Sequence, residues 1–558
     1  MRRSVKVAAL ASAATLLAIG ASMTSFAAAR GWTQEDGEWV WLDSNGDRAT
    51  ETFKLSGTTY YWLNDEGNLG CDELVEYDSN YYYVDETGAM VRNQWREVEN
   101  EDDDDEFEDT IWYYFQSSGK AYKSGKKTIN GQSYIFNDEG KMMFGWIKNE
   151  GSNSYSKASV EDSESTFWKT ADYYAGEAND GAVVTNAWRQ IRVEYDDPET
   201  ELTDVDEGEN DFWFYFGSNG KKYGGDLEGR EYTEADQKAG YTTKTISGHK
   251  YAFSLEDGHM LSEWTPIASN ATDAQYFSDP EVGARISKGW FKVVPSKNVD
   301  SKKSEDGDNE AQWFYADNSG DLIRMQVKSI NGKKYLFNDN GECKAGVYKL
   351  VFSDDTTLSD LKKLNDEDEY TSDTFKAAIV NKDASGINMT AATTDRSGVY
   401  YFETPLDTNA AMKSGSCSVE FDGETFNFKF STSGNKGKGI TKRDGNCIYV
   451  NGLKIKADKD DKYVAYKCTV VDNKIGGKVE TISGLEIKGS ALVALGKDQG
   501  KTLEGNYCLI SSNGTIVSSG TKKDGDDYKI KVEKYLIRSV TDNDNNALLT
   551  VTPEAVTE

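Results

Sequence analysis

The chain repeats a short unit in which a run of aromatic residues ends in a glycine turn. Three of these turn glycines, Gly46, Gly67 and Gly88, are 21 residues apart and close the runs WVWLDSNG, YYWLNDEG and YYYVDETG. Alternating aromatic residues followed by Asp, Asn and Gly are typical of a β-strand that enters a tight turn. Each unit is therefore predicted to be a β-hairpin of about 20 residues.

The same unit returns along the first 350 residues or so of the chain. Further turn glycines are Gly119, Gly140, Gly220, Gly320 and Gly341, with weaker copies near Gly181, Gly258 and Gly283. A single hairpin cannot bury its own aromatic face, so the units are expected to stack on one another. The predicted fold class is all-β, an elongated β-hairpin solenoid of about 20-residue repeats followed by a second β-rich region.

A longer period lies on top of the short one. Trp112, Trp213 and Trp313 recur about every 100 residues. A lengthened segment separates each of them from an earlier tryptophan, which is Trp95, Trp188 or Trp290. Two of these segments carry acid runs, Asp102 to Glu108 and Asp196 to Glu209. We interpret the runs as expanded hairpin tips in solvent. Calcium binding and attraction of a cationic ligand are the alternatives.

The two ends of the chain differ from the repeats. Residues 1–29 have basic residues, an apolar run from Val7 to about Gly20 and a small-residue stretch ending at Ala29, which predicts a secretory signal peptide. The apolar run is too short for a membrane span. Residues 30–346 are assigned to the repeats. All tryptophans precede residue 314, so residues 347–558 are predicted to be a separate β-rich region, and whether it consists of degenerate repeats stays open.

Composition excludes several classes of function. Against 63 basic residues stand 95 acidic ones, a formal net charge of −32, which opposes binding to nucleic acid. The only histidines are His249 and His259, so a Ser-His or Cys-His nucleophile has almost no candidates. The six cysteines lack metal-ligand spacing, and bridges among the last four are left open. Paired carboxylates could hydrolyse a glycan, but we expect no enzyme, cofactor or metal.

The stretch GWTQEDGEWVWLDSNGDRAT, from Gly31, resembles a known repeat. Its order of Gly-Trp, turn, aromatic triplet and glycine turn is similar to the choline-binding or cell-wall-binding repeat of Gram-positive surface proteins. Gly-Trp returns at Gly145 and Gly289, and the resemblance covers roughly residues 31–346. Related repeats occur in glucan-binding domains and clostridial toxins. The resemblance implies a hairpin solenoid that binds choline or a saccharide.

The resemblance also implies where the ligand binds. Family members place two tryptophans of one hairpin, an aromatic residue of the next and often a methionine around a quaternary ammonium group, held by cation-π attraction. In the first unit the matching residues are Trp32 and Trp39, with Tyr60 or Trp62 from the next unit. The other implied pairs are Trp95 with Trp112, Trp188 with Trp213, and Trp290 with Trp313.

Two of these pairs depart from the family pattern in the unit that follows them. Strand alternation puts Ser133 with Ile135, and Lys334 with Leu336, at the expected cage-facing positions. The neighbouring aromatic residues, Tyr134, Phe136, Tyr335 and Phe337, are then expected to face the core. An open aromatic ledge that stacks on a sugar ring is the alternative. Met90, Met143 and Met260 stand where the family often has methionine, and core packing remains the alternative for any single aromatic residue.

The function expected from these features is binding without catalysis. A secreted repeat protein at the cell surface or cell wall would bind a wall polymer, either choline-bearing teichoic acid or a polysaccharide. Two alternatives are kept: an adhesin or scaffold stalk that presents the C-terminal region, and a glucan-binding protein. No nucleic-acid partner and no membrane span are expected.

Overall fold

The computed structural model describes most of the chain. The described residues are 30–100, 109–157, 167–194, 209–227, 230–265, 274–296, 299–300, 310–380, 396–404, 409–458, 460–470, 479–487, 489–498, 501–524 and 528–554. The predicted signal peptide, the acid run from Asp102 to Glu108 and most of the run from Asp196 to Glu209 lie outside them. The chain divides into two compact units, residues 1–268 with 277–285 and residues 269–276 with 286–558.

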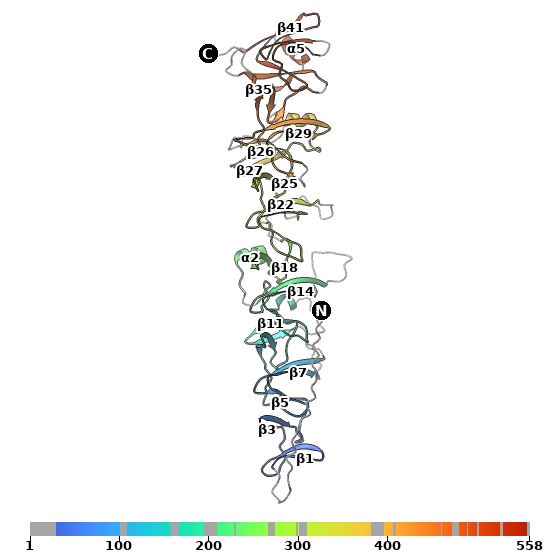
Figure 1. Cartoon of the computed structure of the whole chain (residues 1–558), viewed down its shortest axis with the longest axis vertical. Coiled ribbons are helices and arrows are strands. Elements are labelled where there is room, and N and C mark those ends of the chain that lie inside the picture. Colours follow the sequence, from blue (N-terminus) through green and yellow to red (C-terminus); the bar gives the residue numbers. More distant parts are fainter. Residues whose placement is uncertain are drawn as a thin grey trace. The chain divides into compact units, whose positions relative to one another are not determined.

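The first unit consists of small antiparallel hairpin sheets, as the repeats predict (Figure 1). Its pairs are β1 (Gly31–Glu35) with β2 (Glu38–Leu42), β3 (Thr52–Ser56) with β4 (Thr59–Leu63), β5 (Glu73–Tyr77) with β6 (Asn80–Val84), β7 (Gln94–Glu99) with β8 (Thr110–Phe115), and β9 (Gly125–Ile129) with β10 (Gln132–Phe136). Next come β11 (Trp146–Gly151) with β12 (Ser154–Lys157) and β13 (Tyr173–Tyr174), β14 (Ala187–Glu194) with β15 (Glu209–Phe216), and β16 (Tyr241–Ile246) with β17 (His249–Ser254) and β18 (Met260–Leu261). Two short helices, α1 (Phe167–Thr170) and α2 (Glu234–Ala239), interrupt the series, and β19 (Glu263–Trp264) pairs with β20 (Tyr276–Phe277).

The turn that closes a repeat is stabilised by its own acidic or amide side chain. Asp43 Oδ1 accepts hydrogen bonds from the backbone N–H groups of Asn45 at 2.8 Å and Asp47 at 3.1 Å. Gly46 lies inside this turn with a φ of +84°, a conformation that residues with a Cβ atom rarely adopt. The recurring Asp/Asn-x-x-Gly sequence is therefore a local requirement of the turn.

Each hairpin of the repeat packs through both of its faces. Ile111 and Phe115 of β8 lie in one apolar cluster with Tyr83 of the preceding hairpin. Trp112 of the same strand lies in a different cluster with Phe136 of the following hairpin. Because side chains alternate along a strand, one parity faces backward along the series and the other faces forward.

Backbone hydrogen bonds join consecutive hairpins. The residue two positions after a turn glycine donates its N–H to the second strand of the preceding hairpin. Met90 N donates to Tyr60 O at 2.8 Å, and Met142 N donates to Trp112 O at 2.8 Å. The stacking of neighbouring hairpins within this unit therefore has a backbone component that does not depend on side-chain identity.

The second unit begins with two more hairpin sheets and continues with larger ones. The first sheets are β21 (Gly289–Val293) with β22 (Gln312–Ala316), and β23 (Gln326–Ile330) with β24 (Lys333–Phe337) and β25 (Cys343–Lys344). One three-stranded sheet has the order β27 (Leu358–Lys363), β26 (Gly346–Phe352), β28 (Gly398–Phe402). Another has the order β35 (Val479–Ile487), β34 (Tyr463–Val470), β37 (Tyr507–Ser511). One five-stranded sheet has the order β29 (Gly415–Phe421), β30 (Glu424–Phe430), β33 (Leu453–Lys454), β32 (Cys447–Val450), β31 (Lys442–Asp444). The other has the order β36 (Thr502–Glu504), β41 (Ala547–Thr552), β40 (Leu536–Thr541), β39 (Tyr528–Glu533), β38 (Gly520–Asp524). The helices of this unit are α3 (Ser372–Val380) and α5 (Gly489–Asp498).

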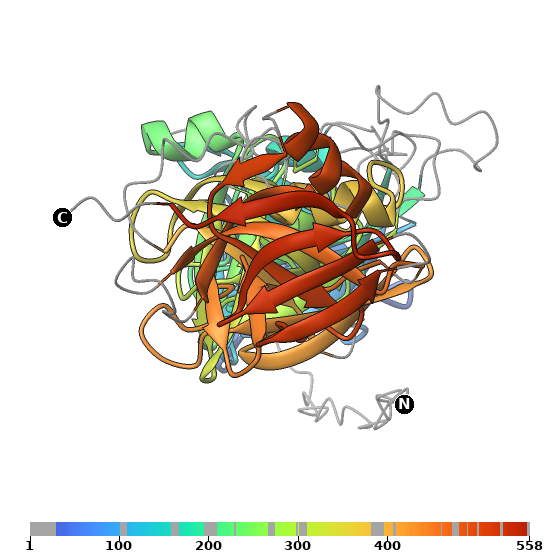
Figure 2. The same cartoon turned by 90° about the horizontal axis from the view of Figure 1, so that it is seen from above.

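The larger sheets occupy the region after the composition change at residue 346. Figure 2 shows the strands of the last sheet, in red, side by side. One pairing in that sheet, β36 with β41, is parallel, unlike the hairpins of the repeats. The backbone link between repeats nevertheless continues into this region, because Met412 N donates to Lys334 O at 2.7 Å.

All six cysteines are free thiols. Two of them meet in the core of the second unit, where Cys468 of β34 and Cys508 of β37 share a side-chain hydrogen bond that, with burial, raises the pKa of Cys468.

Within the described part of the chain, no group of three or more His, Cys, Asp or Glu side chains could hold a metal ion. Among the helices of those same residues, none has the length and apolar character needed to cross a membrane.

Candidate ligand-binding site

The most developed aromatic site lies between the β7–β8 hairpin and the β9–β10 hairpin. Trp95 of β7 and Trp112 of β8 meet at 75°, with ring centroids 6.5 Å apart. Tyr134 of β10 approaches Trp95 to 4.8 Å at 65°. All three rings are partly exposed, so two hairpins together form an angled aromatic wall that solvent can reach.

Similar groups form at two more of the predicted tryptophan pairs. Trp290 and Trp313 meet at 83° with centroids 6.3 Å apart, and Tyr335 lies 4.9 Å from Trp290. In the first unit, Tyr251 lies 4.9 Å from Trp188, and both pack against the same buried cluster as Trp213. We call these three groups the aromatic corners: Trp95-Trp112-Tyr134, Trp188-Trp213-Tyr251 and Trp290-Trp313-Tyr335.

The third ring of each corner corrects an expectation from the sequence. We expected Ser133 and Ile135 to face the tryptophans and Tyr134 to face away from them. Instead Tyr134 contacts Trp95, and the fully buried Ile135 packs forward against the next hairpin. The reason is the two-sided packing: a corner combines the forward face of one hairpin with the backward face of the next, and these faces have opposite parity along the second strand. Tyr335 and Leu336 repeat this reversal.

The first tryptophan pair is completed differently from the prediction. Trp32 contacts Tyr61, with centroids 5.4 Å apart, and also its cross-strand partner Trp41. Trp39 holds the position on β2 that Trp112 has on β8, because Trp39 O and Trp112 O both accept the backbone bond from the following repeat. No ring contact joins Trp32 to Tyr60 or Trp62 in the described structure. This group is therefore a less complete version of the aromatic corner.

Tyr60 and Trp62 face forward, away from Trp32. Trp62 is buried with Val75, Tyr82 and Val84. Tyr60 is exposed, and the Arg92 guanidinium group lies 5.0 Å from its ring centroid. Both residues belong to the packing between the second and third hairpins.

A sulfur-bearing side chain adjoins each aromatic corner. Met142, Met260 and Cys343 lie in the buried clusters against which the three corners pack. Each stands two residues after a turn glycine. Of the three expected methionines, Met90 and Met260 stand at this position and Met143 one residue later, but only Met260 adjoins a complete corner; Met90 and Met143 pack in clusters without one.

Two of the corners contain a buried hydrogen-bond donor without a partner. The indole Nε1 atoms of Trp112 and Trp213 are buried, and neither donates a hydrogen bond within the described structure. Buried indole N–H groups usually find an acceptor, because leaving one unpaired costs about 1–3 kcal/mol. Both atoms are closed off from solvent, so an acceptor from a ligand reaches them only if the corner opens.

The corners differ in the residue that lies directly opposite the second tryptophan. Glu97 is the cross-strand partner of Trp112, Gln190 of Trp213 and Lys292 of Trp313. Directly opposed residues of an antiparallel pair share one face of the sheet. The three corners therefore have an acidic, a neutral and a basic neighbour, which distinguishes them electrostatically.

A fourth aromatic group, beside the Gly145-Trp146 motif, is filled by the chain itself. The Lys222 ammonium group lies 5.3 Å from the ring centroid of Trp146, 6.0 Å from that of Trp168 and 5.9 Å from that of Phe214. It also donates to Trp168 O at 2.6 Å, and the side chain is fully buried. This internal cation was not predicted from the sequence.

A signal for Lys222 does exist in the repeat. Lys222 stands two residues after the turn glycine Gly220, which is the position that Met142 and Met260 hold in their own repeats. Its burial lowers the pKa of the Lys222 amino group to about 7, although Asp257 and Asp172 act in the opposite direction. A lysine at the methionine position therefore indicates a self-occupied group and not an open corner.

The fold and its corners define a class: a hairpin-repeat protein with aromatic sites between consecutive repeats. No protein-family model matches the chain. Among curated proteins, glucosyltransferase-S of Streptococcus mutans serotype c is 22% identical over 308 residues, 55% of this chain and 15% of that protein. Glucosyltransferase-I of Streptococcus downei is 21% identical over 342 residues, 59% of this chain and 20% of that protein. The chain thus spans only a fifth or less of these relatives.

Similar solved structures include proteins of Streptococcus pneumoniae. The modular autolysin LytC, solved in complex with a synthetic peptidoglycan ligand, has a TM-score of 0.29 and 18% identity over 57% of this chain and 54% of that chain. Choline-binding protein F has a TM-score of 0.26 and 15% identity over 56% of this chain and 98% of that chain. These matches confirm the resemblance that the repeats predict.

Proposed function

We propose that the chain is a secreted, non-catalytic repeat protein that binds a polymer of the bacterial cell wall through its aromatic corners. Its hairpins stack as a β-hairpin solenoid, and each corner takes one small group of the polymer. The observation that carries the proposal is the recurrence of Trp-Trp-Tyr at Trp95-Trp112-Tyr134, Trp188-Trp213-Tyr251 and Trp290-Trp313-Tyr335, always from two consecutive hairpins. Packing alone would not require one combination of partly exposed rings at three separate places.

A quaternary ammonium group such as choline is the ligand we favour. Two indole rings and a phenol ring meet there at steep angles, and a cation that lies against an electron-rich ring face gains about 0.5–2 kcal/mol per contact. Support comes from Lys222, whose ammonium group already lies 5–6 Å from three rings in this chain. The corresponding polymer is choline-bearing teichoic acid.

A neutral glycan is the second candidate, and a separate observation favours it. A sugar oxygen would supply the acceptor that the buried indole N–H groups of Trp112 and Trp213 lack, provided that the corner opens to admit it, and a trimethylammonium group would not. Similarity to two glucosyltransferases points the same way, since enzymes of that name handle glucose units. In this case the rings stack on sugar faces, and a glucan or wall polysaccharide is the partner.

Either ligand would be bound by avidity. A polymer that reaches a second corner binds it at a high effective concentration, so weak single contacts can give firm attachment. This explains why three corners are useful where one would bind a monomer only weakly. The stalk or adhesin remains the alternative if the corners serve packing alone.

Calorimetric titration of the full chain with choline, and separately with glucan oligosaccharides, tests the proposal. Saturable binding that is reduced in Trp112→Ala but kept in Trp62→Ala would support ligand binding at the corner, and the ligand that gives heat would identify its class. Trp62 is the matched control because it occupies an equivalent second strand but lies in a closed apolar cluster. Silence in both titrations would favour the stalk.

A further inference from the structure

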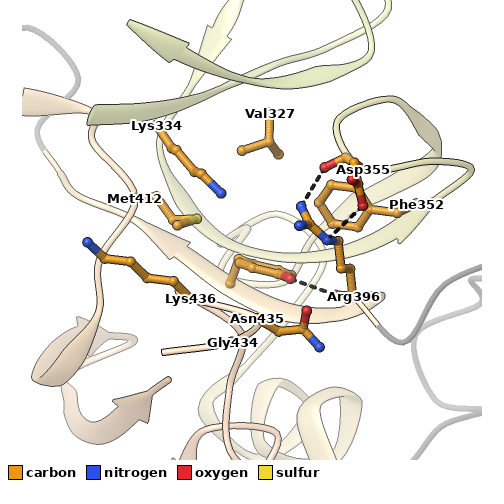
Figure 3. Close-up of a pocket in the computed structure, with 10 residues that line it drawn as sticks. Val327, Lys334, Phe352, Asp355, Arg396, Met412, Gly434, Asn435 and Lys436 are labelled. Carbon is orange, nitrogen blue, oxygen red and sulfur yellow. Dashed lines mark hydrogen bonds and ion pairs between the residues drawn. The ribbon is translucent and has the colours of Figure 1, made fainter. Parts of the chain in front are cut away.

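A pocket in the second unit carries a concentration of positive charge in an otherwise acidic chain. Its cavity volume is about 20 Å³, and it opens to solvent. Its lining includes Lys334 of β24, Arg396 just before β28, and Lys436 of the loop after β30. Asp355 is the only acidic residue among the lining residues (Figure 3). Three cations and one carboxylate give the lining a net positive charge, although the whole chain has a formal net charge of −32.

Arg396 is held in place but keeps most of its donors. Its Nη1 atom donates to Asp355 O at 2.6 Å, and its Nε atom lies 3.2 Å from Asp355 Oδ1. Its own carbonyl accepts from the Tyr400 hydroxyl at 2.6 Å. A guanidinium group has about five N–H donors, so these contacts leave roughly three of them for another acceptor.

Lys334 forms no such ion pair within the described residues. Figure 3 shows its amino group extending toward the middle of the pocket, where the Arg396 guanidinium group also lies. Within the described residues, no carboxylate lies at ion-pair distance from the Lys334 amino group. Burial lowers the pKa of Lys334, and the charges of Arg396 and Lys436 lower it further, whereas the charge of Asp355 acts in the opposite direction. The pocket thus holds cations that repel one another and would be stabilised by an anion.

We propose that this pocket binds a phosphate-type oxyanion, with Lys334 and Arg396 as its main donors and Lys436 closing over it. A tetrahedral oxyanion accepts several hydrogen bonds at once, and Arg and Lys are the side chains that supply them. Lys436 is exposed and on a loop, so its flexible side chain can turn toward the anion. The anion is either free phosphate or a phosphodiester group of a polymer.

The anion pocket and the proposed polymer-binding function use different residues. None of the aromatic corners includes a residue of the pocket. Lys334 nevertheless adjoins Tyr335, which belongs to the third corner and points to the opposite side of β24. A polymer that alternates a cationic group with phosphate could therefore contact both sites, but the pocket needs no corner in order to bind an anion.

Titration with inorganic phosphate, followed by phosphorus NMR line width on the full chain, tests the proposal. Lys334→Met and Lys436→Met should weaken phosphate binding, and Lys334→Met should do so by roughly tenfold or more, the effect of losing one charge-assisted hydrogen bond. Lys333→Met is the matched control, because it removes the same charge from an exposed neighbour on β24 outside the pocket. Circular dichroism of each variant checks that the fold is kept.

A variant with the opposite sign makes the test sharper. Asp355→Asn removes the carboxylate that competes for Arg396, so phosphate should bind more tightly to it than to the unaltered chain. Repeating the titration with a glycerol phosphodiester separates the two sources: tighter binding than inorganic phosphate indicates a polymer, and weaker binding indicates the free ion. Equal loss in Lys334→Met and Lys333→Met, or no saturable phosphate binding at all, would overturn the site, whatever the choline and glucan titrations show.

Discussion

The ammonium group of Lys222 lies 5.3 Å from the ring centroid of Trp146. Lys222 stands at the same position of its repeat as Met142 does two hairpins earlier in the chain. One aromatic group of this chain is therefore occupied by a cation of its own, while the three corners leave their ring faces partly exposed. The group around Trp146 is therefore filled from within the chain, whereas the corners are the places where we propose that a ligand binds.

The pH dependence of stability should reveal Lys222. Its pKa is about 7 in the folded chain and near 10.5 when exposed, so between these values the unfolded chain binds more protons. Stability must then rise with pH across this window. We expect the urea concentration at the unfolding midpoint to increase as the pH is raised from about 7 to about 9, and to increase less in Lys222→Met.

Tyrosines should not interfere in that range. Burial raises the pKa of Tyr173 to about 12 from an ordinary value of 10.0, so its contribution, a loss of stability with rising pH, begins only near pH 10. An unchanged pH slope in Lys222→Met would mean that the buried amino group is not the cause.

Tryptophans at the corners and in closed clusters should respond differently to truncation. Trp112→Ala removes one wall of a corner, and we expect the affinity of that corner for its cationic ligand to fall about 2- to 30-fold, the equivalent of about 0.5–2 kcal/mol. Trp62→Ala leaves a cavity among Val75, Tyr82 and Val84 and should cost about 3–5 kcal/mol of stability. Titration together with urea unfolding separates the two effects, and equal binding losses in both variants would contradict the assignment.

The charge opposite the second tryptophan should order the corners in affinity for choline. Glu97 attracts a cation beside Trp112, whereas Lys292 repels one beside Trp313. We expect Glu97→Gln to weaken choline binding at the first corner by about two- to fivefold, and Lys292→Gln to strengthen it at the third by a similar factor.

The indole N–H signals of Trp112 and Trp313 in NMR spectra report each corner separately. Because these charges are exposed to solvent, high salt should reduce both effects. Identical affinities in all variants at low salt would show that the opposed residue does not reach the ligand.

Two glycines with similar backbone angles should differ in their tolerance of a Cβ atom. Gly224 and Gly248 have φ values of +80° and +86°, so alanine is strained at both by about 1–2 kcal/mol. At Gly224 a Cβ atom would also lie 2.7 Å from Ser254 O, whereas at Gly248 nothing lies within 4 Å. Gly224→Ala should therefore cost a further 1–3 kcal/mol or so in urea unfolding, and equal costs would contradict this close approach.

The hairpins and their turns could be predicted from the sequence because they depend on neighbours in the chain. Alternation along a strand and the Asp-x-x-Gly turn act over a few residues, so WVWLDSNG already indicates a strand followed by a turn at Gly46. The tryptophan pairs could be predicted for the same reason. Trp95 and Trp112 belong to one hairpin, and their register follows from it.

Only the tertiary structure decided what each hairpin meets. The choice of Tyr134 over Ser133 depends on a second hairpin that presents its backward face to Trp95, and no property of one hairpin specifies that parity. The same holds for Lys222 within the rings of Trp146 and Phe214, and for Lys334 beside Arg396, which are 62 residues apart in the chain. The sequence alone determined the repeat, because its interactions are local; the sites arise where repeats pack together, and that packing exists only in the folded chain.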